Sequence, residues 1–229
     1  MNILALDTSM GACSAAVLRE GPSAQRLHAL LVEMPRGHAE ALMPMVEEVL
    51  AEAEIEATDL DLIAATTGPG SFTGVRIAIA AARGLALVTE AKLFGADSLS
   101  VMARAARDAG LEPGGPFAVA VDARRGMLYL GLYDATGTRL DGPLLIAPHD
   151  AVDRLPESLS LAVGSGATLL ADAAATRGRM ITPEHPALQP SAAALAEMAL
   201  ESGTTTEVLR PLYMRPPDAK PQAPVLARR

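Results

Sequence analysis

The sequence predicts an α/β protein of two similar lobes, each a mixed sheet flanked by helices. Strand-like apolar runs alternate with helix-like stretches along all 229 residues, a pattern typical of α/β domains. The opening pattern of the chain is a strand with an aspartate at its tip, a tight turn and a returning strand, and it occurs again after residue 116. Half of the residues are hydrophobic, which is enough for two cores. We therefore predict an N-terminal lobe over residues 1–98 and a C-terminal lobe over residues 99–229.

The N-terminal lobe is predicted to open with an antiparallel meander and to continue with strand–helix units. Short apolar runs between turn residues indicate the strands. The helix at residues 39–55 is the clearest, because its apolar residues recur at the three- and four-residue spacing of one helix face. The expected strands cover residues 2–6, 13–18, 25–34, 60–65 and 92–96, and the second helix covers residues 73–89.

The C-terminal lobe is predicted to repeat this order. A helix capped by Asp97 or Ser98 leads into it, and a Pro- and Gly-rich stretch follows at residues 112–116. Pro-rich residues 182–190 are expected to be irregular and residues 211–221 extended, because proline does not fit a helix interior. The expected strands cover residues 117–121, 127–133, 139–146 and 161–163, and the expected helices cover residues 149–155, 167–177 and 191–203.

A glycine-rich turn between a buried strand and a helix has two interpretations. It contains Gly68, Gly70, Ser71 and Gly74, and either Ser71 or Thr73 can cap the helix that follows. Glycines at such a turn allow tight packing of the strand against the helix. The same arrangement can bind a phosphate or a partner loop, because free N–H groups converge at a helix N-terminus. A P-loop is excluded, because no lysine follows Gly74.

Composition and charge argue against several classes of protein. The net charge of −8, with three Phe, three Tyr and no Trp, argues against a large nucleic-acid-binding surface. The one cysteine, Cys13, allows no disulfide within the chain, which suits a reducing compartment. No uncharged apolar run approaches the ~20 residues of a membrane span, and the N-terminus has no signal-peptide pattern. We expect a cytoplasmic protein with no membrane contact.

Two aspartates at equivalent turns, followed by a Gly-Ser-Gly sequence, resemble the nucleotide loops of the actin-like ATPases (the RNase H-like, ASKHA superfamily). This resemblance implies two actin-like lobes with a ligand cleft between them. Turn amides would hold phosphate oxygens, and the aspartates would hold Mg²⁺ through water. An ATP-dependent small-molecule phosphotransferase is therefore an alternative function. The candidate residues of these loops are Asp7, Thr8, Ser9, Gly68, Gly70, Ser71, Asp122, Arg124, Gly164 and Gly166.

Five motifs spread over nearly the whole chain resemble the TsaB (formerly YeaZ) family. The most specific is Gly-Pro-Gly-Ser-Phe-Thr-Gly-Val-Arg at residues 68–76. The others are Ile-Leu-Ala-Leu-Asp-Thr-Ser at residues 3–9, Arg-Gly-His at residues 36–38, Val-Asp-Ala-Arg-Arg-Gly at residues 121–126 with Tyr129, and Tyr-Met-Arg-Pro-Pro-Asp-Ala-Lys at residues 213–220. Members of this family are dimerisation subunits of the bacterial complex that makes tRNA threonylcarbamoyladenosine.

The resemblance implies a non-catalytic subunit. Family members pair with the catalytic subunit TsaD and work with the ATPase TsaE. The complex transfers a threonylcarbamoyl group from its adenylate to an adenosine beside the tRNA anticodon. The resemblance therefore implies that the assembled complex binds tRNA. The resemblance also implies vestigial phosphate loops and no tightly bound cofactor, with ATP or ADP bound only at the level of the complex.

A partner surface is implied as well, in the form of a four-helix bundle with two helices from each subunit. In this chain the helices would be residues 39–55 and 73–89, and the alternative is that both simply cover their own sheet. When the partner is missing we expect a homodimer through the same helices, because exposed apolar patches seldom stay bare. The expected interface residues are Leu42, Met45, Val49, Leu50, Gly74, Ala78, Ala81 and Ala82.

The histidines give no sign of a metal centre. The catalytic relative of this family binds metal through a His-x-x-x-His pair. None of His28, His38, His149 and His185 has a second histidine four residues on. Ser165 lies in Val-Gly-Ser-Gly-Ala and not in the Gly-x-Ser-x-Gly turn of serine hydrolases. We therefore expect no metal site and no catalytic residue.

Overall fold

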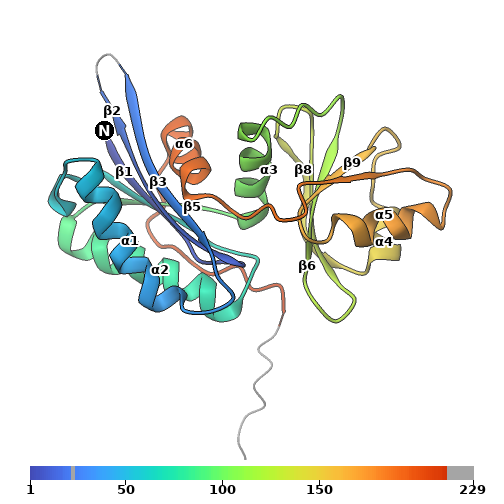
Figure 1. Ribbon diagram of the computed structural model, residues 1–229, viewed down its shortest axis with the longest axis horizontal. Helices are drawn as coiled ribbons and strands as arrows, with labels where there is room; N and C mark the ends of the chain where they lie inside the picture. Colours follow the sequence, from blue (N-terminus) through green and yellow to red (C-terminus); the bar gives the residue numbers. More distant parts are fainter. Residues whose placement is uncertain (22–23, 216–229) are drawn as a thin grey trace, which may run out of the picture.

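The structure, a computed structural model, describes residues 1–21 and 24–215. Two α/β lobes lie side by side, and each contains a five-stranded mixed sheet (Figure 1). The predicted fold class, α/β with two mixed sheets flanked by helices, is confirmed. The part of the last family motif after Arg215 lies outside the described residues, as does the rest of the predicted extended tail.

The N-terminal sheet has the strand order β3-β2-β1-β4-β5. β1 (Asn2–Asp7), β2 (Ala12–Glu20) and β3 (Gln25–Glu33) form the predicted antiparallel meander. β4 (Leu62–Thr66) and β5 (Lys92–Ala96) run parallel to β1. β1 and β4 are buried on both faces, because helices cover the sheet on each side.

Two helices cover one face of this sheet, which was the alternative to a partner surface. They are α1 (His38–Glu52) and α2 (Phe72–Thr89), and a short 3₁₀ turn, η1 (Ala57–Asp59), precedes β4. Ser71 caps α2, since its hydroxyl accepts a hydrogen bond from the Gly74 N–H. The core beneath them combines inward residues of β1, β2 and β4 with the buried faces of both helices.

The C-terminal sheet repeats the same arrangement in the order β10-β9-β6-β7-β8. β6, β7 and β8 are antiparallel, and β9 and β10 add in parallel beyond β6. α4 and α5 cover one face of this sheet. The bounds are β6 (Phe117–Asp122), β7 (Leu128–Tyr133), β8 (Arg139–Ile146), α4 (Pro148–Val152), β9 (Leu161–Val163), α5 (Ala167–Ala175) and β10 (Thr182–Glu184). β10 lies where we predicted irregular chain.

Two helices lie between the sheets. α3 (Ser98–Asp108) places Leu99 and Met102 in the core of the C-terminal lobe, whereas its Val101 joins the core of the N-terminal lobe. α6 (Ala192–Ser202) packs on the N-terminal sheet, on the face opposite α1 and α2 (Figure 1). The helices therefore join the two lobes into one body.

The end of the chain returns to the N-terminal lobe. After α6, the Thr206 N–H donates to the Leu93 carbonyl at 2.7 Å, and the Leu212 N–H donates to the Thr67 carbonyl at 2.7 Å. Leu209, between them, is buried in the core under α1 and α2. The N-terminal lobe is thus built from two separate parts of the chain, which a division at residue 98 does not represent.

α2 is long and apolar enough to cross a membrane by length and composition, and among the described helices no other is. Five of its residues are nevertheless buried within the lobe: Gly74, Val75, Ala78, Ile79 and Ala82. The helix therefore forms part of a folded core, and its length and composition alone are weak support for a span.

Candidate functional site

The first predicted phosphate loop, at the tip of the β1–β2 hairpin, is sealed by the start of α2. The Thr8 hydroxyl enters the hydrogen-bond ladder of α2, donating to the Gly74 carbonyl at 2.6 Å and accepting from the Ala78 N–H at 3.1 Å. The Ser71 N–H donates to the Ser9 carbonyl at 2.8 Å. Thr8 and Ser9 are fully buried as a result. Asp7 and Thr8 are therefore closed off beneath α2, whereas Ser9, Gly70 and Ser71 still border the interlobe cleft.

Two glycines of the 68–76 motif make this seal. A Cβ atom at Gly70 would lie 2.2 Å from the Ser9 carbonyl oxygen, and one at Gly74 would lie 2.1 Å from the Thr8 carbonyl oxygen. Both positions therefore require glycine, because backbone atoms occupy the space of a side chain. Of the two interpretations of this turn, the structure supports tight packing, and the packing partner is the β1–β2 hairpin as well as β4.

Asp7 is enclosed by the same contacts. Its Oδ1 accepts hydrogen bonds from the Ser9 N–H at 3.2 Å, from the Ser9 hydroxyl at 2.6 Å and from the Thr66 hydroxyl. Among the described residues its Oδ2 has no hydrogen-bond partner. Burial raises the pKa of Asp7 from 3.8 to about 6, although the bonds from Ser9 and Thr66 act in the opposite direction. The expected Mg²⁺ role of Asp7 is corrected, since its carboxylate faces protein on every side.

The second predicted loop, at the tip of the β6–β7 hairpin, is open. Asp122 accepts a bond from the Arg124 N–H at 2.7 Å, and its other oxygen lies 3.2 Å from the Arg124 guanidinium. Arg124 and Arg125 both have left-handed backbone conformations, with φ of 64° and 57°. Such angles are uncommon outside glycine. They form a tight turn that has Arg124 and Arg125 at its tip.

The predicted adenosine loop packs beneath this tip. Its middle residue, Ser165, accepts a hydrogen bond from the Asp122 N–H at 3.1 Å. Gly166 donates its N–H to the Ala120 carbonyl at 2.9 Å, and a Cβ atom on Gly166 would lie 2.6 Å from Leu128. The glycines therefore allow α5 to start close against β6 and β7.

A cleft of about 830 Å³ lies between the lobes and contains the open loop. Met10, Phe72 and Tyr213 line it from the N-terminal lobe, and Asp122, Arg124 and Ser165 line it from the C-terminal lobe. At its rim the Arg76 guanidinium stacks 3.6 Å above the Phe72 ring and bonds the Tyr213 hydroxyl. Phe72, Arg76 and Tyr213 come from two separate family motifs and form one cluster here, which the spacing of the motifs in the sequence does not reveal. His38 lies nearby at the start of α1, where its Nε2 bonds the Met10 carbonyl at 3.1 Å.

The structure corrects the choice of interface residues on α1 and α2. Leu42, Met45, Val49, Gly74, Ala78 and Ala82 are buried in the chain's own core, and only Leu50 and Ala81 are partly exposed. The sequence pattern had marked the face that packs on the sheet. The outward face of α2 carries other residues, which are Thr73, Arg76, Ala80, Arg83, Gly84, Leu87 and Val88.

Comparison with known proteins agrees with this architecture. The family model of TsaD, tRNA N6-adenosine threonylcarbamoyltransferase, matches residues 33–222. A Haemophilus influenzae protein named tRNA threonylcarbamoyladenosine biosynthesis protein TsaB is 30% identical, and the alignment covers 72% of each chain. The solved structure titled YeaZ from Pseudomonas aeruginosa is 32% identical with a TM-score of 0.75, covering 93% of this chain and 99% of that one.

The chain belongs to the TsaB (YeaZ) family.

A TsaB of Escherichia coli is 40% identical over 58% of this chain, and the match spans 55% of that relative's length. A Mycobacterium tuberculosis protein described as uncharacterized is 34% identical over 96% of this chain and 95% of its own. The likeness to YeaZ extends over 93% of this chain and so includes both α/β lobes. Within residues 1–21 and 24–215, no group of three or more His, Cys, Asp or Glu side chains could hold a metal ion.

Proposed function

We propose that this TsaB-family chain is a non-catalytic partner subunit of the cytoplasmic complex that makes tRNA threonylcarbamoyladenosine. The observation that carries the proposal is the sealed first loop, where Asp7, Thr8 and Ser9 are fully buried. An enzyme of the actin-like fold would need this loop to hold phosphate and metal. The names of the TsaB relatives supply the pathway, and the family match to TsaD fits a pairing of two subunits with similar folds.

The outward face of α2 is the proposed contact with a TsaD-type catalytic subunit. Leu87 is 84% exposed and Val88 is 79% exposed, an unusual state for two adjacent apolar residues. A Cβ atom on Gly84 would meet no other atom within 4 Å, so packing within the lobe gives no reason for a helix glycine. Glycine in a helix interior costs about 1 kcal/mol relative to alanine. Close approach of a partner helix would account for it.

The same face would form the homodimer when the chain is alone. The small side chains of Ala80, Ala81 and Gly84 would allow two helices to approach closely. Leu87 and Val88 add exposed apolar area. Nucleotide, the TsaE-type ATPase and tRNA would be bound by the assembled complex, and this chain would hold no cofactor tightly by itself. The phosphotransferase alternative is disfavoured by the seal over Asp7.

Pairing with a TsaD-type subunit tests the proposal directly. Leu87→Asp and Ala80→Glu place charges on the outward face without touching the core, and each should weaken the complex at least tenfold in calorimetry. Leu140→Asp is the matched control, because Leu140 is 52% exposed on β8 of the other lobe. Unchanged affinity in both α2 variants would reject this face. Modification of tRNA by the reconstituted complex should require this chain and should fall with the same variants.

A further inference from the structure

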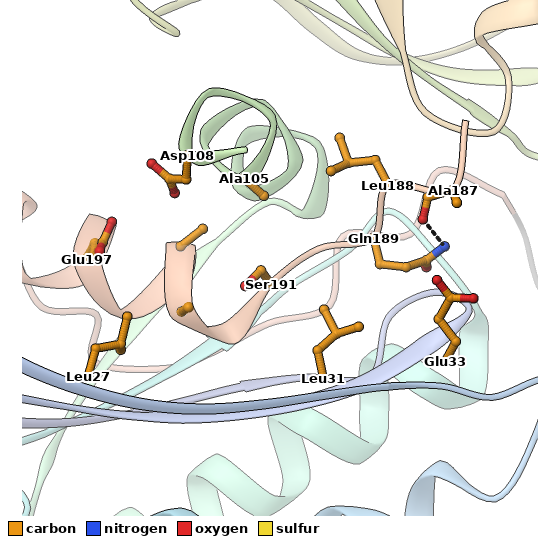
Figure 2. Close-up of a pocket in the computed structure, with 12 residues that line it drawn as sticks. Leu27, Leu31, Glu33, Ala105, Asp108, Ala187, Leu188, Gln189, Ser191 and Glu197 are labelled. Atoms are coloured by element: carbon orange, nitrogen blue, oxygen red, sulfur yellow. Dashed lines mark hydrogen bonds between the residues drawn. The ribbon is translucent and has the colours of Figure 1, made fainter. Parts of the chain in front are cut away.

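A second cavity lies outside the cleft, between β3, α3 and α6 (Figure 2). Its volume is about 400 Å³. Leu27 and Leu31 point into it from β3, and Leu188 lines it from the connection that precedes α6 (Figure 2). Leu27 is 40% exposed and Leu31 is 44% exposed. We call this cavity the β3 groove. It is an apolar surface that the described chain leaves partly uncovered.

The strand that forms one wall of the groove is also a sheet edge. All nine residues of β3 pair with β2, and β3 ends the strand order of the N-terminal sheet. Neither a proline nor a lysine interrupts it. An edge strand of this length with exposed leucines is a template for an added extended segment. Alternate side chains of such a segment would enter the groove.

The groove has an acidic rim. Glu33 stands at one end, and Asp108 and Glu197 stand at the α3 and α6 side (Figure 2). Arg104 bonds Asp108 at 2.9 Å, Glu197 at 2.6 Å and Glu201 at 2.7 Å, so one guanidinium faces three carboxylates. The net charge of the rim is negative, and the matching occupant is an extended segment that is both apolar and basic.

We propose that residues 222–229 of the same chain occupy the β3 groove. Their sequence, Gln-Ala-Pro-Val-Leu-Ala-Arg-Arg, contains the apolar run Val-Leu-Ala directly before two arginines. The described chain ends at Arg215, which lines the interlobe cleft, and Leu188 and Gln189 line both that cleft and the groove. Six residues, 216–221, connect Arg215 to this segment and span up to ~20 Å when extended, and the shared lining residues show that the two cavities adjoin. The groove lies on the opposite face of the sheet from α1 and α2, so this proposal is independent of the proposed partner face.

A spin label on the intact chain tests the proposal. Ala227→Cys offers one reactive site for a nitroxide, because Cys13 is fully buried. The methyl signals of Leu27, Leu31 and Leu188 should broaden at least twofold more than those of Leu140 on the far lobe. Reversing the charges with Arg228→Glu and Arg229→Glu should abolish the difference. Raising the salt concentration should reduce it, since exposed charges are screened.

Two controls separate the outcomes. Glu33→Lys should cut the broadening by at least half, whereas Glu157→Lys, an exposed glutamate in the other lobe, should leave it unchanged. In a mixture of spin-labelled chain and isotope-labelled chain without the nitroxide, the isotope-labelled methyls should stay sharp. Broadening in that mixture would mean that a second copy fills the groove, and it would overturn the proposal. Equal signals for the groove leucines and Leu140 would overturn it as well.

Discussion

The tips of the two repeated hairpins carry the same kind of residue in opposite environments. Asp7 ends β1 and Asp122 ends β6, and each is followed by a tight turn and a returning strand. Asp7 is fully buried beneath α2, whereas Asp122 faces the interlobe cleft beside Arg124. The two tips therefore share a backbone pattern, although one of them is part of a core. A strand-tip aspartate in this fold does not by itself indicate a working phosphate site.

The largest expected effect separates Gly74 of α2, which packs against the first tip, from Gly126 in the second tip. Gly74→Ala should lower the free energy of unfolding by about 3 kcal/mol, because its Cβ would lie 2.1 Å from the Thr8 carbonyl oxygen. Gly126→Ala should cost about 1 kcal/mol, since Gly126 has a φ of 70° but no atom within 4 Å of its Cβ position. Urea unfolding of both variants measures the contrast. Equal costs would mean that the first tip is not sealed as described.

The buried carboxyl should give the protein a pH dependence that the open tip does not share. The pKa of Asp7 is raised from 3.8 to about 6, so between these values the folded state binds the proton more tightly than the unfolded state. Stability from this group is therefore complete below about pH 4 and is lost as the pH rises to about 6, by at most ~3 kcal/mol. Asp7→Asn should remove this fall in unfolding free energy, and Asp122→Asn, which keeps Asp7, should retain it. If the unfolding free energy of Asp7→Asn still falls between pH 4 and pH 6, another group causes the pH dependence.

Loss of the Thr8 hydroxyl, which is inserted into α2, should lower the stability of the fold more than loss of the Ser165 hydroxyl at the open tip. Thr8→Val deprives the Gly74 carbonyl and the Ala78 N–H of their partner inside the core, at a cost of about 1–3 kcal/mol. Ser165→Ala removes one bond to the Asp122 N–H at the cleft, where water can replace it, and should cost about 1 kcal/mol or less. Thermal unfolding compares the two variants. Similar midpoints would contradict the contrast in burial.

The smallest effect is expected at the arginine of the open tip. Arg124→Ala removes an ion pair whose guanidinium side chain is 85% exposed, so unfolding free energy should change by less than about 0.5 kcal/mol. This variant also tests whether the cleft serves a ligand of the complex. Loss of tRNA modification with unchanged stability and unchanged pairing would assign Arg124 a binding role. Unchanged tRNA modification by the Arg124→Ala variant would mean that this turn has no binding role.

Much of the fold followed from the sequence because its signals are local. The hairpin repeat, the cap at Ser71 and the apolar spacing in α1 all depend on residues a few positions apart. The site was harder, because the contacts that seal Asp7 join positions more than 50 residues apart, such as Thr66 and Asp7. Periodicity identified the apolar face of α1 correctly but could not say whether the sheet or a partner covers it. Leu87 and Val88, next to each other at the end of α2, were the overlooked signal of an outward apolar surface.

The return of the chain's end to the first lobe has a consequence for how the protein is made. α6 and Leu209 complete the two layers around the N-terminal sheet, yet they follow the whole second lobe in the sequence. During synthesis, α6 can therefore cover its face of the N-terminal sheet only after the second lobe has been made. Apolar strands that are exposed in such a partly folded intermediate favour aggregation.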